Sequence, residues 1–349
     1  MIKTIGILGG GQLGRMLSMA AARLGLRTHI FEPQASPPAG DVAYRVFTAE
    51  YNDEDALIAF ARSVDVITYE FENIPTEALD ILEKYAPVFP GRNALATSQD
   101  RVTEKRFLES LGLQVAPFAE VESAANLADA LTKIGTPAIL KTRRFGYDGK
   151  GQVKITAPNQ ANAAFDALMG APAVLEGFVD FRCEISIIAA RNAKGEIACF
   201  DPGENVHKNG ILHSTTVPAS ISHAVQTDAV LLAARVLNAL DYVGVMGVEL
   251  FVTNGGLVVN EIAPRVHNSG HWTQNACLID QFEQHIRAVA GWPLGDGQRH
   301  SDAEMINLIG SDIDALEPYQ NEAIHLYGKA EAKPGRKMGH VNKISPKSA

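Results

Sequence analysis

The sequence predicts an N-terminal α/β domain with a doubly wound parallel sheet, followed by a larger α+β region. In the first part, short apolar strand patterns alternate with helical patterns from residue 4 to about residue 91. From about residue 173 onward, strand patterns predominate. The length of 349 residues and the hydrophobic share of 46% leave room for two or three domains.

The N-terminal patterns follow one another as in βαβ units. A strand pattern over 4–10 runs into a helical pattern that ends at Gly25, a residue suited to capping a helix. Further strand patterns follow at 28–33 and 65–74. The alternation continues to the segment 87–91, where we place the end of the first domain.

A glycine-rich turn, GGGQLG at 9–14, joins the first strand pattern to the first helical pattern. It fits the G-x-G-x-x-G pattern of dinucleotide-binding proteins, and Glu32 ends the next strand pattern at a suitable distance. Amides at a helix N-terminus bind phosphate of any origin, however, and glycines also let a helix pack closely on a strand. A nicotinamide oxidoreductase is therefore only one interpretation of this turn.

A second glycine-rich segment, 138–152, begins as an apolar strand pattern that ends at Lys141. Glycines let backbone amides approach phosphate oxygens, and Lys141 and Lys150 supply positive charge. The segment predicts a phosphate-binding flap, with a solvated basic hairpin as the alternative. Its glycines are Gly146, Gly149 and Gly151.

The next strand pattern, 174–189, is interrupted by Glu176 and Gly177. The interruption suits a hinge whose backbone contacts an adenine edge, and Glu184 is placed to contact ribose hydroxyls. Glu184 on a solvated face is the alternative.

The strongest local prediction concerns a hairpin over 243–263. A hairpin symmetric about Gly255 places Glu249 directly opposite Glu261. Two facing carboxylates repel each other unless a cation lies between them, and Mg²⁺ is typically held by one or two carboxylates together with substrate phosphates. A solvated pair, or a bulge that separates the two residues, is the alternative. Arg265, just beyond the hairpin, is expected to hold an acyl-phosphate oxyanion.

Charge and cysteine content exclude several classes of protein. The net charge of −9 argues against a general nucleic-acid-binding or membrane-binding surface. The three cysteines form no CxxC pair, which favours a reducing compartment and no zinc site or disulfide framework. No apolar stretch reaches transmembrane length and no signal-peptide pattern opens the chain, so we expect a cytoplasmic protein.

Six motifs in order carry a resemblance to a known family. They are GILGGGQLGRM at 6–16, DRVTEK at 100–105, GYDGKGQ at 146–152, VGVMGVELFVT at 243–253, NEIAPRVHNSGHWTQ at 260–274 and PGRKMGH at 334–340. The chain resembles the ATP-grasp enzymes, and within them the 5-(carboxyamino)imidazole ribonucleotide synthases of purine biosynthesis. The resemblance covers nearly the whole chain.

The resemblance implies an ATP-grasp fold in three parts: an N-terminal doubly wound α/β domain over 1–98, a central lid with the flap over 99–176, and a larger C-terminal α+β domain over 177–349. It implies that ATP, with Mg²⁺, and bicarbonate carboxylate 5-aminoimidazole ribonucleotide by way of carboxyphosphate, a ligase reaction of IMP synthesis that also yields ADP and phosphate. A homodimer is implied in the same way.

The resemblance also assigns site residues. For ATP these are Arg101, Lys141, Gly146, Tyr147, Asp148, Gly149, Lys150, Gly151, Gln152, Glu176, Gly177, Phe178, Val179, Glu184, His207, Asn260 and Glu261. For Mg²⁺ they are Glu249 and Glu261, and for the ribonucleotide Gln12, Leu13, Glu70, Tyr147, Asp148, Lys150, Lys329 and Arg336. Charge stabilisation is expected from Arg265 and Lys150, and proton management from Glu70 or His271, although His207, His267 and His271 equally suit structural roles.

Two departures from the family pattern stand out. Lys150 occupies a position where arginine is expected, which keeps the charge but loses bidentate geometry. The sequence ends soon after PGRKMGH, which leaves the packing of the C-terminal segment open. The alternatives within the same machinery are a formate-dependent glycinamide ribonucleotide transformylase or a biotin-type carboxylase; a non-enzymatic nucleotide-binding module is a further one.

Overall fold

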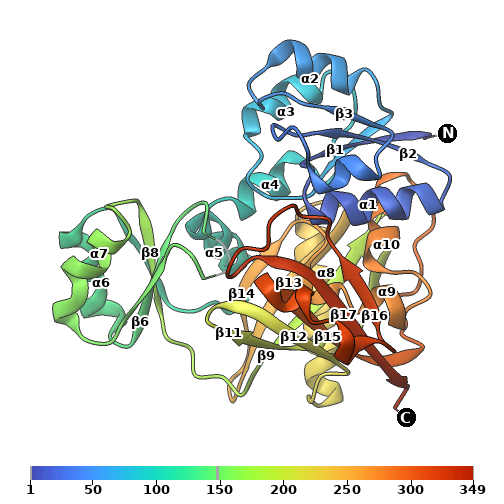
Figure 1. Cartoon of the computed structure of the whole chain (residues 1–349). Coiled ribbons are helices and arrows are strands. Elements are labelled where there is room, and N and C mark those ends of the chain that lie inside the picture. The colour runs from blue at the N-terminus through green and yellow to red at the C-terminus, as the bar shows by residue number, and fades with distance from the viewer. Residues whose placement is uncertain (1, 147–148, 349) are drawn as a thin grey trace.

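The computed structural model describes residues 2–146 and 149–348, which form three sheets with their covering helices (Figure 1). The N-terminal sheet lies above the C-terminal sheet in this view, and the small middle sheet projects to one side. Helix α5 (Arg101–Ser110) lies between the projecting sheet and the rest of the molecule.

The N-terminal sheet is parallel, with the strand order β3-β2-β1-β4. Helix α1 packs on one face, and α2 and α3 pack on the other, so the predicted doubly wound domain is confirmed. Both β1 and β4 are almost wholly buried, as expected of apolar strands in a parallel sheet. The elements are β1 (Thr4–Leu8), α1 (Gln12–Arg23), β2 (Arg27–Phe31), η1 (Pro38–Asp41), β3 (Arg45–Phe47), α2 (Glu54–Ala61), β4 (Val66–Tyr69), α3 (Thr76–Leu82) and α4 (Arg92–Ser98).

The middle sheet is antiparallel, with the order β5-β8-β6-β7. Helices α6 and α7 cover one face and share a separate apolar core with the strands. A core of its own lets this unit stand away from the other two sheets. Its elements are β5 (Phe118–Val121), α6 (Ala124–Ile134), β6 (Ala138–Thr142), β7 (Gln152–Ile155), η2 (Pro158–Gln160), α7 (Ala161–Ala167) and β8 (Ala173–Gly177).

The C-terminal sheet runs in the order β14-β13-β9-β11-β12-β15-β17-β16, with β10 paired to β9. Helix α8 packs on β9, β13 and β14, while α10 packs between this sheet and α1. The elements are β9 (Cys183–Arg191), β10 (Ile197–Cys199), β11 (Gly203–Lys208), β12 (Ile211–Val217), α8 (His223–Ala239), β13 (Gly244–Thr253), β14 (Gly256–Ala263), η3 (Asn268–Gly270), α9 (Thr273–Ala276), α10 (Gln281–Val289), β15 (Ser301–Ile309), η4 (Gly310–Asp314), η5 (Glu317–Tyr319), β16 (Ala323–Leu326) and β17 (Lys337–Pro346).

Two general findings bear on the expectations from sequence. Cys183, Cys199 and Cys277 are all free thiols. Within the part of the chain that the structure describes, no helix has the length and apolar character needed to cross a membrane.

Candidate active site

The hairpin of β13 and β14 brings Glu249 and Glu261 together. Its register pairs these two residues directly, so their side chains leave the same face of the sheet. The turn is tighter than a hairpin centred on Gly255, and a bulge at Asn260 shifts the register by one residue to compensate. The predicted pairing is confirmed, although the reason is different: the bulge creates the alignment that a bulge was expected to spoil.

The two carboxylates have different charge environments. The Glu249 side chain is only 13% exposed, and burial raises its pKa to about 7, with added repulsion from Glu261. Burial also opposes ionisation of Glu261, but Arg101 and Lys141 hold its pKa at about 2. Arg101 Nη1 lies 3.0 Å from Glu261 Oε2. Glu261 is therefore ionised at neutral pH, whereas the ionised form of Glu249 would be stabilised by a bound cation.

A divalent cation that shares its ligands with phosphates fits this arrangement. Throughout residues 2–146 and 149–348, no group of three or more His, Cys, Asp and Glu side chains is close enough to hold a metal ion by itself. Mg²⁺ rarely uses such an all-protein cage and accepts one or two carboxylates plus substrate phosphates. A cation bound between the two carboxylates would offset both the burial of Glu249 and its repulsion from Glu261.

The raised pKa of Glu249 predicts that the stability of the protein depends on pH. The folded-state pKa of about 7 lies above the ordinary 4.5, so stability is lost as the pH rises from about 4.5 to about 7. We expect Glu249→Gln to remove this loss. Between pH 4.5 and pH 8, the free energy of unfolding of the wild type should therefore fall by on the order of 3 kcal/mol more than that of Glu249→Gln. Urea unfolding at the two pH values, without Mg²⁺ or nucleotide, measures it.

The comparison with wild type is needed because Glu104 has a pKa of about 8, raised by burial and by Glu261, and titrates in the same direction in both proteins. If the free energies of unfolding of the wild type and of Glu249→Gln depend on pH in the same way, the pKa of Glu249 is not raised in the folded protein.

A second cluster lies where the middle sheet meets α5. Lys141, at the end of β6, places its Nζ 2.8 Å from Glu176 Oε2, and Lys105 on α5 places its Nζ 3.1 Å from Glu176 Oε1. All three side chains are buried. Sequence reasoning expected Lys141 and the backbone around Glu176 but not Lys105.

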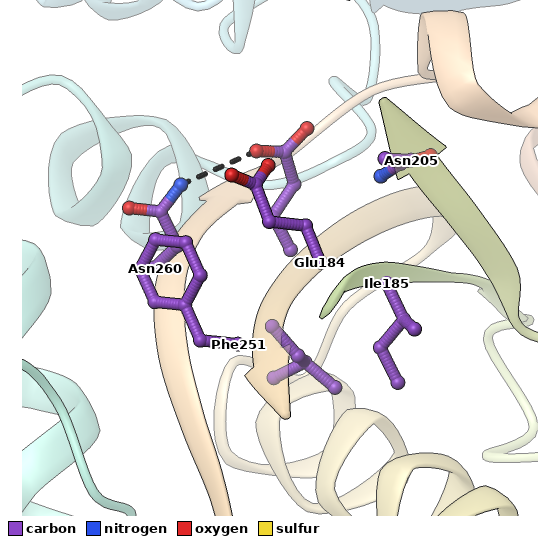
Figure 2. A pocket seen from close by; sticks show the side chains of 7 residues that line it. Glu184, Ile185, Asn205, Phe251 and Asn260 are labelled. Atoms are coloured by element: carbon purple, nitrogen blue, oxygen red, sulfur yellow. Dashed lines mark hydrogen bonds between the residues drawn. The ribbon is translucent and has the colours of Figure 1, made fainter. Parts of the chain in front are cut away.

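Two of the residues predicted to bind ATP, Glu184 and Asn260, line a small hollow together with Asn205, Glu249 and Phe251. Figure 2 shows Glu184 and Asn260 beside Phe251 at this hollow. Glu184 Oε2 lies 2.6 Å from His207 Nδ1. Burial opposes protonation of His207, but Glu184 and Glu249 raise its pKa above the usual value. Asn260 Nδ2 donates to Glu249 Oε2 over 3.3 Å, which links the hollow to the carboxylate pair.

Aromatic rings flank the same region. Phe181 stacks on Phe251 with ring centroids 4.7 Å apart. Phe178, in the predicted hinge with Val179, is partly exposed and lies under the Lys154 ammonium at 4.9 Å. Gly177 ends β8 immediately before this pair.

The flap residues that the structure describes lie close to the other clusters. Gly149 and Gly151 have positive φ angles of 75° and 70°, which glycine adopts without strain. Gly149 packs against Gly210 in the turn between β11 and β12, and Gly146 lies near Arg101. Lys150 lies between the two positive-φ glycines and Gln152 begins β7, while the predicted residues Tyr147 and Asp148 lie outside the described part of the chain.

Arg265 reaches from the C-terminal sheet to the N-terminal domain. Its Nε and Nη2 donate to the two oxygens of Glu72, at 2.5 Å and 3.2 Å, and its Nη1 donates to Val266 O. Burial opposes ionisation of Glu72, but Arg265 lowers its pKa below the usual value. A bidentate pair of this kind fixes the plane of the guanidinium group. Glu72 was not predicted from sequence.

The first glycine turn uses much of its hydrogen-bonding capacity within the protein. Glu70, just beyond the end of β4, accepts from the amides of Gly11 and Gly14, and Glu32 accepts from Gly10 N at 2.8 Å. A side chain at Gly11 would lie 2.5 Å from Glu70 Oε1. Glu32 is thus engaged with the turn, which disfavours a ribose contact and a dinucleotide site.

The other residues of this turn lie at the start of α1. Gln12 and Leu13 are its first two residues, so their amides belong to the helix N-terminus, where anions bind favourably. Burial raises the pKa of Glu70, although the amides of Gly14 and Gly11 partly offset this. A raised pKa suits a group that exchanges protons.

His271 lies in a packed group of rings. Its Nδ1 is 2.9 Å from Gln281 Nε2, and its ring packs against Phe282 and His340. Burial lowers the pKa of His271 well below the usual value. These are the contacts of a neutral, structural histidine, so its role in proton transfer stays a prediction.

The predicted phosphate clamp lies in the segment before β17. Lys329 Nζ donates at 2.7 Å to the backbone oxygen of Lys337, the residue that follows Arg336. Arg336 Nη1 donates to Glu331 O. The neighbouring Gly328 lies against Arg15 of α1, so this segment approaches the helix that begins with Gln12 and Leu13.

Three family models match the chain. They describe a ribonucleotide synthetase preATP-grasp domain at residues 2–99, an ATP-grasp domain at residues 106–282 and a phosphoribosylaminoimidazole carboxylase C-terminal domain at residues 303–349. The N5-carboxyaminoimidazole ribonucleotide synthase of Brucella melitensis is 56% identical to the chain, over 99% of this chain and 97% of that protein.

Solved structures agree with this match. The ADP complex of an N5-carboxyaminoimidazole ribonucleotide synthetase has a TM-score of 0.95 at 41% identity, covering 98% of this chain and 92% of the other. The Aspergillus clavatus enzyme in complex with ADP and 5-aminoimidazole ribonucleotide has a TM-score of 0.93 at 31% identity, covering 99% and 94%.

These findings confirm the fold and the family that the motifs predicted, and they set aside the oxidoreductase and formate-dependent alternatives. The chain belongs to the N5-carboxyaminoimidazole ribonucleotide synthases, the ATP-grasp ligases of purine biosynthesis.

Proposed function

We propose that MgATP, bicarbonate and 5-aminoimidazole ribonucleotide meet at the site formed by the carboxylate pair, the Lys141 cluster and the first glycine turn. The observation that carries this proposal is the alignment of Glu249 with Glu261, flanked by Arg101 and within electrostatic range of Lys141. Relatives that bind ADP, and in one case also 5-aminoimidazole ribonucleotide, support the same choice of ligands.

Glu249 and Glu261 would hold Mg²⁺, which supplies charge neutralisation at the triphosphate. The adenosine end of ATP is proposed to lie at the hollow beside Glu184, His207 and Phe251, near the hinge that follows Glu176. Lys141, Arg101 and the amides of the flap would then face the phosphates. Fixed cations and amides stabilise charge that develops during phosphoryl transfer, where positioning and electrostatics supply most of the catalysis.

The proposed chemistry has two steps. A bicarbonate oxygen attacks the γ-phosphorus, and the bond to the bridging oxygen breaks to release ADP. The carboxyphosphate then loses phosphate by cleavage of its C–O bond, and the carbon accepts the electron pair of the exocyclic amine. Arg265, held in plane by Glu72, is proposed to face the carboxyphosphate oxygens, and Glu70 is proposed to receive the amine proton. Enclosure by the flap would exclude water from the intermediate.

The ribonucleotide phosphate is proposed to bind between the amides of Gln12 and Leu13 and the side chains of Lys329 and Arg336. The approach of the Gly328 segment to α1 supports this clamp. Lys150 of the flap, whose neighbours Tyr147 and Asp148 carry the same proposed role, would close over the aminoimidazole.

Arg336→Ala tests the clamp. A charged hydrogen bond to phosphate contributes about 1.5–3 kcal/mol, so the KM for 5-aminoimidazole ribonucleotide should rise tenfold or more while that for ATP changes little. Steady-state kinetics with each substrate varied in turn measures both constants. Lys333→Ala is the matched control, since Lys333 is exposed and pairs with Glu331. Equal rises in both constants for Arg336→Ala would rule out the clamp.

One assay tests the whole proposal. Protein, MgATP and labelled bicarbonate are mixed with and without 5-aminoimidazole ribonucleotide, and phosphate release and incorporation of label are followed together. We expect both to depend on the ribonucleotide, on Mg²⁺ and on bicarbonate. Phosphate release without incorporation of label under any condition would contradict the proposal.

We further propose that the chain works in the cytoplasm as a homodimer. The three free cysteines support a reducing compartment, and the homodimer rests on the family resemblance alone, for which light scattering is the test. The proposed division at 1–98, 99–176 and 177–349 is supported at its first boundary by the end of α4 at Ser98, while its second boundary lies one residue before the end of β8 at Gly177.

A further inference from the structure

Glu176 is shared by two lysines that approach it from different elements. Glu176 lies on the same face of the β6–β8 pair as Lys141, since Glu176 is opposite Ile139, two residues before Lys141. Lys105 reaches the other carboxylate oxygen from α5, across the junction between the middle sheet and the rest of the molecule. Glu176 therefore has an ammonium group beside each of its two carboxylate oxygens.

The two lysines differ in what else they face. The Lys105 side chain is 1% exposed and the Lys141 side chain 11%. Lys141 lies at the end of β6, where the flap begins, and its charge acts on Glu261 of the carboxylate pair. Lys141 therefore lies at the edge of the cluster that faces the proposed phosphates, while Lys105 is enclosed behind Glu176.

Helix α5 connects this cluster to the carboxylate pair. Arg101 and Lys105 are one helical turn apart and so share a face of α5. Arg101 contacts Glu261, and Glu104 accepts a hydrogen bond from Ile262 N at 2.6 Å. Arg101 N also donates to Arg143 O, just beyond β6. The helix thus fixes the position of Lys105 relative to the carboxylate pair and to the end of the strand that carries Lys141.

We propose that Lys105 is a positioning residue for ATP binding: it neutralises Glu176 so that Lys141 can leave this carboxylate and bind the phosphates. With Lys105 in place, Glu176 keeps a cationic partner when the Lys141 ammonium turns to the nucleotide. The inference rests on the proposed role of Lys141 at the phosphates.

Removal of Lys105 should therefore weaken ATP binding without loss of any group that touches ATP. Glu176 would keep Lys141 as its remaining ion-pair partner, with Arg101 acting on it through its charge. Moving Lys141 away would then leave a buried carboxylate without an ion-pair partner, which is costly. Lys141 would then be held by Glu176 at the expense of the nucleotide. Removal of the Glu176 charge as well should free Lys141 again.

The experiment compares the ATP KM of four variants in the complete reaction. Lys105→Met, which keeps the length of the side chain, should raise this constant about tenfold or more. Lys105→Arg should restore part of the loss, and the double variant Lys105→Met with Glu176→Gln should restore most of it. Arg106→Met is the control, because Arg106 is the next residue on α5 but is 66% exposed. The KM values for bicarbonate and the ribonucleotide should change little in each variant.

An unchanged ATP KM in folded Lys105→Met, or a double variant no better than Lys105→Met, would overturn the inference. If Lys105→Met does not fold, the double variant, which lacks the buried charge of Glu176, decides by its own ATP KM: a value near that of the wild type supports the inference, and a value far above it refutes the inference. Lys141→Met separates the two levels of the proposal. An unchanged ATP KM in Lys141→Met refutes the phosphate role itself, whereas a raised value there with normal Lys105→Met refutes only the positioning role.

Discussion

Arg265→Ala should lower kcat by about a hundredfold to a thousandfold, because it removes a positioned cation from the proposed carboxyphosphate site. The guanidinium group is held by both oxygens of Glu72 and is mostly buried, so it is aligned before substrate binds. Stopped-flow or steady-state phosphate release at saturating substrates measures the loss.

The structure also predicts a cost in stability for this variant. Without Arg265, the Glu72 carboxylate loses its partner, and since it is 25% exposed we expect a loss of about 1–3 kcal/mol in the free energy of unfolding. Glu72→Gln keeps Arg265 but loosens its alignment, and should reduce kcat by about tenfold to a hundredfold. Folded Arg265→Ala with near-normal turnover would remove Arg265 from the mechanism.

Glu261→Gln should have an effect of similar size for a different reason. Glutamine keeps the shape of the side chain and an oxygen that can accept from Arg101, but it lacks the charge that the proposed Mg²⁺ site requires. We expect kcat to fall at least a hundredfold at ordinary Mg²⁺ concentrations and the Mg²⁺ concentration for half-maximal activity to rise. A Mg²⁺ titration at saturating ATP measures both changes.

Glu304→Gln is the control for this variant. Glu304 is on β15 of the same sheet, is 43% exposed and pairs with Lys343, far along the sheet order from β13 and β14. It should leave the Mg²⁺ dependence unchanged. A Glu261→Gln enzyme with the wild-type Mg²⁺ dependence would mean that the metal binds elsewhere.

Local patterns were sufficient for the N-terminal α/β domain, whereas the three-part ATP-grasp architecture was inferred from the family resemblance. The N-terminal strands β1 and β4 are buried on both faces and therefore stand out as apolar runs between helical patterns. The pairing of Glu249 with Glu261 was also predictable, since both residues lie on one hairpin. Its physical reason was not, because neither the tighter turn nor the compensating bulge at Asn260 leaves a clear signal in the sequence.

Residues that act across domain junctions were missed. Glu72 meets Arg265 only because the N-terminal domain packs on the C-terminal sheet, and no local pattern encodes that contact. Lys105 lies in a highly charged segment that reads as a solvated helix, yet its side chain is buried against Glu176. One signal was present: DRVTEK is part of a family motif, and a motif lysine four residues after Arg101 shares a helix face with it.

The most direct test of the whole account is the position of the metal. A crystal structure of the protein with Mn²⁺ and a non-hydrolysable ATP analogue should give an anomalous difference peak for the metal. This peak should lie within coordination distance of an oxygen of Glu249, an oxygen of Glu261 and an oxygen of the triphosphate. An anomalous peak away from these two carboxylates, with the triphosphate bound elsewhere, would contradict it.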